Sequence, residues 1–127
     1  MKPIVLVEDE SQVRSFLKKL LSREGFEVFA AHDGPSAISL IRENSGNVAA
    51  LVTDIEMVGM SGIALAKTVA EEFPQVPVVF VTAVLVSEED LRRDVPQYVM
   101  LQKPFYPKQL VQSLRTLLVA EPIPPTL

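Results

Sequence analysis

The chain has 127 residues, 48% of them hydrophobic and 22% charged, which is typical of one globular domain and argues against disorder. Its 12 basic residues are scattered and outnumbered by 16 acidic ones, which argues against direct binding to nucleic acid. Cys is absent, the chain enters a strand at once, and no apolar stretch could span a membrane; we therefore expect no disulfide, no signal peptide, no membrane contact and a cytoplasmic location.

Short apolar runs rich in β-branched residues predict strands, most of them buried on both faces of a parallel sheet. They lie at 3–7, 26–31, 48–53, 76–81 and 98–102. Segments with apolar residues at helical spacing separate them and predict helices at 11–24, 34–43, 61–73, 87–95 and 107–119. This alternation predicts a doubly wound α/β fold with five helices flanking a five-stranded parallel sheet.

Local signals mark the ends of several helices. Gly25 is expected to end the first helix, Asp33 to cap the second, and Pro74 to stop the third. Ser87 is predicted to cap the fourth helix, with acidic residues in its first turn. The apolar face predicted for the first helix consists of Val13, Phe16, Leu17, Leu20 and Leu21.

Polar residues follow four of the five strands. They are Glu8-Asp9, Asp54, Thr82 and Lys103-Pro104. In open α/β sheets ligands bind outside the carboxyl ends of the strands, so these side chains can converge in one crevice. The strand order 2-1-3-4-5 of flavodoxin-like folds brings them together, because it places the first and third strands side by side.

The residue types in this crevice suit phosphoryl chemistry. Three carboxylates repel one another, so without a cation at least one should hold its proton more tightly than usual. Ligands that are all oxygen atoms favour Mg²⁺. The hydroxyl of Thr82 and the charge of Lys103 each suit a phosphoryl oxygen, and the central Asp54 is the candidate nucleophile that would form an aspartyl phosphate.

In order and spacing, five segments resemble the signatures of response-regulator receiver domains, which act in two-component and phosphorelay signalling. They are Val5-Leu6-Val7-Glu8-Asp9-Glu10, Val52-Thr53-Asp54-Ile55-Glu56-Met57, Gly59-Met60-Ser61-Gly62, Val81-Thr82-Ala83 and Lys103-Pro104-Phe105. We therefore expect a receiver domain over residues 1–120 and a Pro-rich tail over 121–127. Residues 101–105 also resemble receivers of hybrid histidine kinases, so a stand-alone receiver and one belonging to a hybrid kinase both remain open.

The resemblance implies a phosphoacceptor and a metal site. Asp54 would accept a phosphoryl group from a phosphohistidine on a histidine kinase or a histidine phosphotransfer protein. Mg²⁺ would be bound by Asp9, Asp54 and the backbone carbonyl of Glu56, and by Glu8 through water. The chain would catalyse only its own phosphorylation and dephosphorylation, so we do not expect an enzyme acting on other substrates.

The resemblance also implies a switch. Thr82 and Lys103 would contact the phosphoryl oxygens, Ala83 would keep space open beside them, and the bond before Pro104 would be cis. Phosphorylation would draw Thr82 inward and change the surface formed by the fourth helix, the fifth strand and the fifth helix. That surface would bind an unknown downstream protein, and a homodimer is compatible with it.

Two positions depart from the family pattern, and the charge of a third bears on the reaction. Receivers usually carry an aromatic switch residue three positions before the Lys, whereas this chain has Met100, a flexible side chain that could repack. Tyr98 lies on the same strand face, about 7 Å away, and is a candidate substitute. Val58 stands where Pro is common, which predicts a less rigid loop. The acidic side chain of Glu56 is expected to face the mouth of the site, where it would disfavour an anionic donor or alter attack by water.

Two other functions share part of this residue set. A small phosphatase or phosphotransferase would also form an aspartyl phosphate, but it needs a proton donor, for which Glu56 is the only nearby candidate, and a lid, for which no insertion is visible. A pseudo-receiver, which is a binding module of fixed conformation, would be expected to have lost the acids and the Lys that are present here.

Overall fold

The computed structural model describes residues 2–119, and strands and helices alternate along them. The strands are β1 (Ile4–Val7), β2 (Val28–Ala31), β3 (Ala50–Asp54), β4 (Val78–Thr82) and β5 (Tyr98–Gln102). The helices are α1 (Ser11–Arg23), α2 (Gly34–Glu43), α3 (Gly62–Glu72), α4 (Glu89–Asp94) and α5 (Pro107–Val119). The predicted Pro-rich tail lies outside the described residues. Within the described part, no helix is long and apolar enough to cross a membrane.

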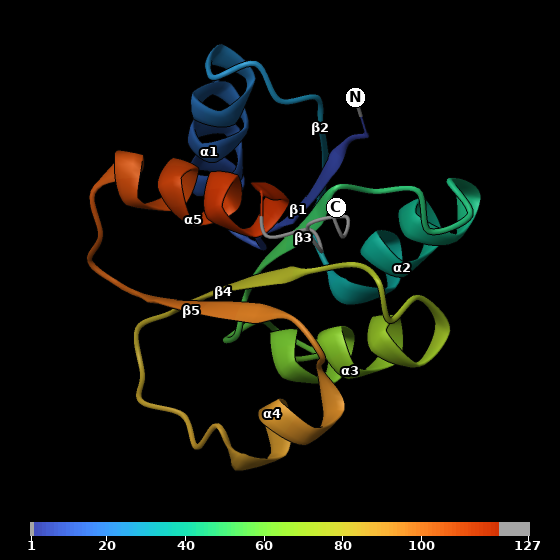
Figure 1. Cartoon of the computed structure of the whole chain (residues 1–127). Coiled ribbons are helices and arrows are strands. Elements are labelled where there is room, and N and C mark those ends of the chain that lie inside the picture. Colours follow the sequence, from blue (N-terminus) through green and yellow to red (C-terminus); the bar gives the residue numbers. More distant parts are fainter. Residues whose placement is uncertain (1, 120–127) are drawn as a thin grey trace, which may run out of the picture.

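The strands form one parallel sheet in the order β2-β1-β3-β4-β5, which confirms the predicted order (Figure 1). β1 pairs with both β2 and β3, so the chain reverses its direction of winding at β1. In the ladders Val7 is opposite Thr53, and Thr82 is opposite Gln102. The carboxyl ends of four strands therefore meet along one edge of the sheet.

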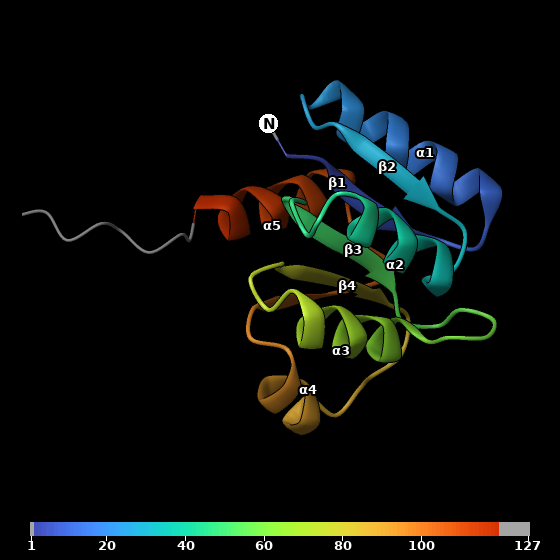
Figure 2. The same ribbon diagram turned by 90° about the vertical axis from the view of Figure 1, so that its right-hand side faces the viewer.

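Helices cover both faces of the sheet: α1 and α5 lie on one, and α2, α3 and α4 on the other (Figure 2). Alternate strand residues supply the two cores. The core under α1 and α5 includes Ile4, Leu6, Ala50, Val52, Val79 and Val81. The opposite core includes Val5, Val7, Leu51, Val78 and Phe80. Apolar residues thus point both ways from the strands, as expected for a sheet buried on both faces.

Three predicted strands begin two residues too early, because the apolar residues that precede the observed strands are buried without joining the sheet. Phe26, Val48 and Val76 each have less than a tenth of their surface exposed. Their backbone N–H groups instead close turns, onto the carbonyls of Leu21, Gly46 and Phe73, respectively. Predicting strands from apolar residues alone therefore overestimated the strand lengths.

Most of the predicted helix ends are confirmed. Asp33 caps α2 by accepting from Ser36 N at 2.9 Å, and Gly25 after α1 has a φ of +94°, a conformation that favours glycine. The predicted Ser87 cap of α4 is wrong. The N-cap position is Glu88, which makes no side-chain capping bond; its carboxylate accepts from the Tyr98 hydroxyl at 2.6 Å instead. A tertiary contact thus occupies the residue where α4 begins.

The apolar face predicted for α1 is too wide. Leu17 and Leu21 are buried, but Phe16 is 57% exposed, so its predicted inward position is wrong. Successive residues turn by about 100° around a helix, and five apolar residues therefore span a wider arc than the sheet covers. Phe16 lies at the margin of that arc, beside a cavity described below.

Candidate functional site

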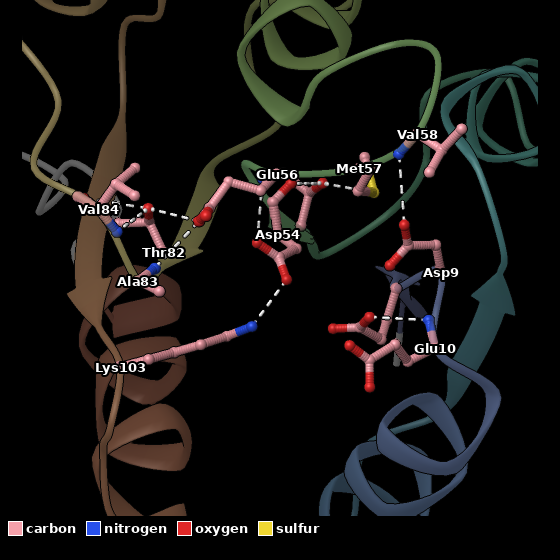
Figure 3. A network of polar contacts seen from close by, with 12 residues as sticks. Asp9, Glu10, Asp54, Glu56, Met57, Val58, Thr82, Ala83, Val84 and Lys103 are labelled. Carbon is pink, nitrogen blue, oxygen red and sulfur yellow. Dashed lines mark hydrogen bonds and ion pairs between the residues drawn. The ribbon is translucent and has the colours of Figure 1, made fainter.

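The predicted site residues gather at the carboxyl edge of the sheet (Figure 3). Asp54 is the last residue of β3, and Thr82 is the last residue of β4. Lys103 directly follows β5 and is joined to Pro104 by a cis peptide bond, as the family resemblance implied. Asp9 follows β1 on the other side of Asp54. The fold therefore brings together polar residues that lie up to 94 positions apart (103 − 9).

Asp54 is buried and held from two directions. Lys103 Nζ donates to Asp54 Oδ2 at 2.7 Å, and the Glu56 backbone N–H donates to Asp54 Oδ1 at 3.1 Å. Burial, the largest influence, acts to lower the pKa of Lys103, but its hydrogen bond to Asp54 and the surrounding carboxylate charges raise the net pKa above the ordinary value. Lys103 therefore stays cationic beside the central carboxylate.

Glu56 connects the end of β3 to the end of β4. Its Oε1 atom lies 3.1 Å from Thr82 Oγ1 and accepts from the Ala83 backbone N–H at 3.1 Å. Thr82 Oγ1 also accepts from the Val84 N–H at 3.0 Å. The sequence predicted the Glu56 side chain at the mouth of the site but missed both of its partners, since no local pattern specifies a contact that spans 26 residues.

The carboxylates after β1 accept hydrogen bonds from backbone groups. Glu8 Oε2 accepts from the Glu10 N–H at 2.9 Å, and Asp9 Oδ2 from the Val58 N–H at 3.3 Å. Burial raises the pKa of Glu8 to about 7, and the charge of Asp54 adds a smaller contribution. The carboxyl of Glu8 thus holds its proton more tightly than usual, as predicted for one of the three carboxylates. The main cause is burial rather than repulsion between the carboxylates.

Glu8, which is 4% exposed, lines a cavity of about 260 Å³. The cavity lies between α1 and the start of α5, and most of its lining is apolar. Its walls are formed by Leu6, Val7, Glu8, Val13, Phe16, Leu17, Val52, Asp54, Val81, Lys103, Phe105 and Pro107. The carboxyl of Glu8 therefore borders apolar side chains, which disfavour its charged form.

The carboxylates do not form a cage for a metal. Within residues 2–119, no three His, Asp or Glu side chains are grouped closely enough to hold an ion. The predicted set, however, has only two directly bound carboxylates, Asp9 and Asp54, together with the backbone carbonyl of Glu56. These donors are all oxygen atoms and carry two negative charges, which fits Mg²⁺, an ion that usually retains several waters. The donor chemistry therefore fits, with Glu8 in an outer position.

Two glycines shape the loop that carries Glu56 and Val58. Gly59 has a φ of +82°, a conformation that other residues adopt only with strain. A Cβ atom on Gly62 would lie 2.0 Å from the backbone oxygen of Asp54, so only glycine allows α3 to start this close to β3. The loop thus returns to the end of the strand, where the Gly62 N–H donates to the Ile55 carbonyl at 2.9 Å, while Val58 is 88% exposed.

Tyr98 and Met100 lie away from the polar contacts around Asp54. Both are half-buried and pack with the core between the sheet and the helices α2, α3 and α4. The Tyr98 ring meets Phe80 edge-on, with the centroids 5.8 Å apart, and its hydroxyl donates to Glu88 next to α4. Of the two candidate switch residues, Tyr98 has the direct polar link to the α4 segment.

Comparison with known proteins agrees with this arrangement. Residues 4–115 match the model of the response regulator receiver domain family. The chain is 35% identical over 124 residues to the response regulator receiver protein CpdR of Brucella abortus, covering 94% of this chain and 99% of that protein. It is 37% identical over 122 residues to the transcriptional regulatory protein CpxR of Klebsiella pneumoniae, covering 93% of this chain but only 50% of CpxR.

Solved structures give the same result. The receiver domain of the hybrid histidine kinase CckA is 32% identical, with a TM-score of 0.78 and coverage of 91% of this chain and 98% of that domain. The response regulator TrrA of Thermotoga maritima, solved in complex with Mg²⁺ and BeF, is 30% identical, with a TM-score of 0.77 and coverage of 92% and 99%. The fold, the positions of the site residues and these matches lead to one conclusion: the chain belongs to the response regulator receiver domain family.

Proposed function

We propose that Asp54 accepts a phosphoryl group from a phosphohistidine on a histidine kinase or a histidine phosphotransfer protein. The observation that carries this proposal is the 2.7 Å contact between Lys103 Nζ and Asp54 Oδ2, with the Thr82 hydroxyl at the end of the adjacent strand. A buried carboxylate next to a fixed cation and a hydroxyl donor is suited to attack a phosphoryl group and to stabilise the product.

In the proposed reaction an Asp54 oxygen forms a bond to phosphorus as the phosphorus–nitrogen bond of the phosphohistidine breaks. The electron pair of the broken bond stays on the imidazole nitrogen, which leaves as a neutral ring when its other nitrogen carries a proton. Lys103 neutralises charge on the transferred group, and Thr82 donates to one of its oxygens. The Glu56 N–H orients the carboxylate through its 3.1 Å bond to Oδ1.

Mg²⁺ would be held by Asp9, Asp54 and the backbone carbonyl of Glu56, with Glu8 acting through water. When bound, it would neutralise part of the negative charge of the incoming phosphoryl group. Without it, two acidic side chains already face backbone donors, Glu8 that of Glu10 and Asp9 that of Val58. These groups are available to turn toward a cation at the cost of modest hydrogen bonds.

The proposed output is a change in the surface of α4, β5 and α5. Phosphorylation would redirect the Thr82 hydroxyl, which now contacts Val84 and Glu56 in flanking loops. The loop after Thr82, which contains Val84, leads to Glu88, whose carboxylate accepts from the Tyr98 hydroxyl. Tyr98 is therefore the candidate relay, and Met100 is a side chain that repacks. A downstream protein or a second copy of the chain would read this surface, and we place the reaction in the cytoplasm.

An amide NMR titration with Mg²⁺ and then beryllofluoride, which mimics an aspartyl phosphate, tests the proposal. We expect saturable shifts around Asp9, Asp54, Thr82 and Lys103, extending to Tyr98, and no beryllofluoride-dependent shifts in Asp54→Asn. An equal response in Asp54→Asn would overturn the phosphoacceptor role. An absence of response in the wild type would favour a pseudo-receiver of fixed conformation, and turnover of an external phosphoester would favour a phosphatase.

A further inference from the structure

The carboxylate of Glu56 occupies an unusual position for a loop side chain. A single oxygen, Oε1, lies 3.1 Å from both the Thr82 hydroxyl oxygen and the Ala83 backbone nitrogen. These donors belong to consecutive residues at the end of β4, whereas Glu56 follows β3 (Figure 3). One anionic oxygen facing two convergent donors is also the arrangement that a phosphoryl oxygen would adopt there.

The same residue is tied to the phosphoacceptor itself. The backbone N–H of Glu56 donates to Asp54 Oδ1 at 3.1 Å, while its side chain reaches the donors of β4. Thr82 is 2% exposed, so its hydroxyl has little access to water when Glu56 is in place. The single hydroxyl proton of Thr82 has two acceptors at 3.1 Å, the Glu56 carboxylate and the Val84 carbonyl, and of these only Glu56 is charged and also occupies the Ala83 N–H. A group bound to Asp54 must displace the Glu56 oxygen to use both donors.

We propose that the Glu56 carboxylate is an internal competitor, which holds the Thr82 and Ala83 donors in the resting state and must leave them when Asp54 is phosphorylated. This inference rests on the proposed function of Asp54 and extends it to a residue that opposes binding. Two effects add: the donors cannot serve both oxygens, and a carboxylate close to a phosphoryl group adds like-charge repulsion. Glu56 would thereby set how readily this chain accepts the group.

Replacing the side chain separates these two effects. Glu56→Ala removes both the charge and the acceptor oxygen, and we expect the affinity for beryllofluoride in saturating Mg²⁺ to rise by about three- to tenfold, a range that allows for the exposure of the carboxylate. Glu56→Gln keeps an acceptor oxygen without the charge and should give a smaller increase. The matched control is Glu71→Gln on α3, which removes the same charge from an exposed Glu and should leave the affinity unchanged.

The Ala83 amide resonance provides a second readout that a general effect on stability would not produce. Without beryllofluoride, the Ala83 resonance should shift in Glu56→Ala, because the Ala83 N–H loses its acceptor oxygen. It should keep its wild-type position in Glu71→Gln. In the wild type it should move when beryllofluoride binds, as one acceptor replaces the other. Thermal unfolding of each variant would verify that the fold is retained.

The outcomes distinguish failure of this inference from failure of the proposed function. If the wild type binds beryllofluoride through Asp54 but Glu56→Ala binds it equally or more weakly, Glu56 is not a competitor and the inference is overturned. If the wild-type response does not depend on Asp54, the phosphoacceptor role fails first. An Ala83 amide that is unaffected by Glu56→Ala would also overturn the inference, because the resting contact would then be absent in solution.

Discussion

The two sides of the site differ in how far the protein has assembled them. On the side of β3, β4 and β5, Asp54 contacts Lys103 directly, and Thr82 is within hydrogen-bonding distance of Glu56. On the side of β1, Glu8 and Asp9 accept from nearby backbone groups and make no hydrogen bond or ion pair with Asp54 among the described residues. Opposite charges hold the first side together, whereas like charges keep the second apart until a cation neutralises them. The side of β3, β4 and β5, which we call the phosphoryl side, is therefore preorganised. The side of β1, which we call the metal side, depends on its ligand.

Removing the cation from the preorganised side should have the largest effect. Lys103→Ala leaves the buried Asp54 without its ion pair and the transferred group without its positive partner. We expect phosphorylation by acetyl phosphate to slow by about 100-fold or more, as for the loss of one donor to a developing charge. Rates measured by intact-protein mass spectrometry would test this, with Lys108→Ala on α5 as the control. A rate close to that of the wild type would mean that Lys103 is not part of the reaction.

Glu8 offers a test of the metal side through pH. Its pKa of about 7 in the folded state lies above the ordinary value of 4.5, so between these values the folded state binds more protons than the unfolded state. The free energy of unfolding should therefore fall as the pH rises from about 4.5 to about 7, by up to about 3 kcal/mol, with no further loss from this group above that range.

Urea denaturation across this pH range would measure the contribution of Glu8. Glu8→Gln, which stays neutral, should flatten the pH dependence, and the exposed Glu10→Gln should not. Saturating Mg²⁺ should also flatten it in the wild type, since a nearby cation favours the charged carboxylate. An unchanged slope in Glu8→Gln would assign the pH dependence to another group.

Asp9→Asn should weaken the metal side while leaving the phosphoryl side as it is. Loss of one charged ligand is expected to lower the affinity for Mg²⁺ by about tenfold or more. Amide shift titration would give this affinity, with Glu10→Gln as a neighbouring control. In the absence of metal, the resonances of Thr82 and Ala83 should match those of the wild type. Shifts in those residues would show that the two sides are coupled even without the ion.

Tyr98→Phe tests how far the preorganised side extends toward α4 and should have the smallest effect. It removes the 2.6 Å hydrogen bond to Glu88 while keeping the edge-on contact with Phe80. We expect a loss of about 1 kcal/mol in the free energy of unfolding and smaller beryllofluoride-induced shifts in α4. Tyr106→Phe, at a side chain that is 74% exposed, is the control. Full-sized α4 shifts in Tyr98→Phe would exclude this residue as the relay.

Local sequence signals predicted the elements better than their contacts. Asp33 caps the start of a helix and Gly25 follows the end of one, and both act within one helical turn of their own position. Their roles could therefore be identified from neighbouring residues. Val48 and Val76 were assigned to strands because they are apolar, yet their N–H groups close turns. Ser87 has the right residue type for a cap, but a hydrogen bond between Glu88 and a residue on β5 occupies the start of α4. The strand errors arose because apolar residues next to a strand can be buried in a turn, and the Ser87 error arose because a residue on another element contacts the start of the helix.

The strand order 2-1-3-4-5 rested on the requirement that the polar strand-end residues meet and on known flavodoxin-like folds, not on any local pattern. From the sequence alone, the alternation of strands and helices and the polar residues at the strand ends could be predicted, because hydrophobic period and strand-end position are local properties. The sequence had this much to offer on the fold. It also indicated that a carboxyl would hold its proton. The folded structure identifies this carboxyl as Glu8, which is buried beside a cavity, and shows that Glu56 reaches Thr82 and Ala83. Such pairings depend on how neighbouring strands and loops place side chains from distant parts of the chain, and no short segment contains that information.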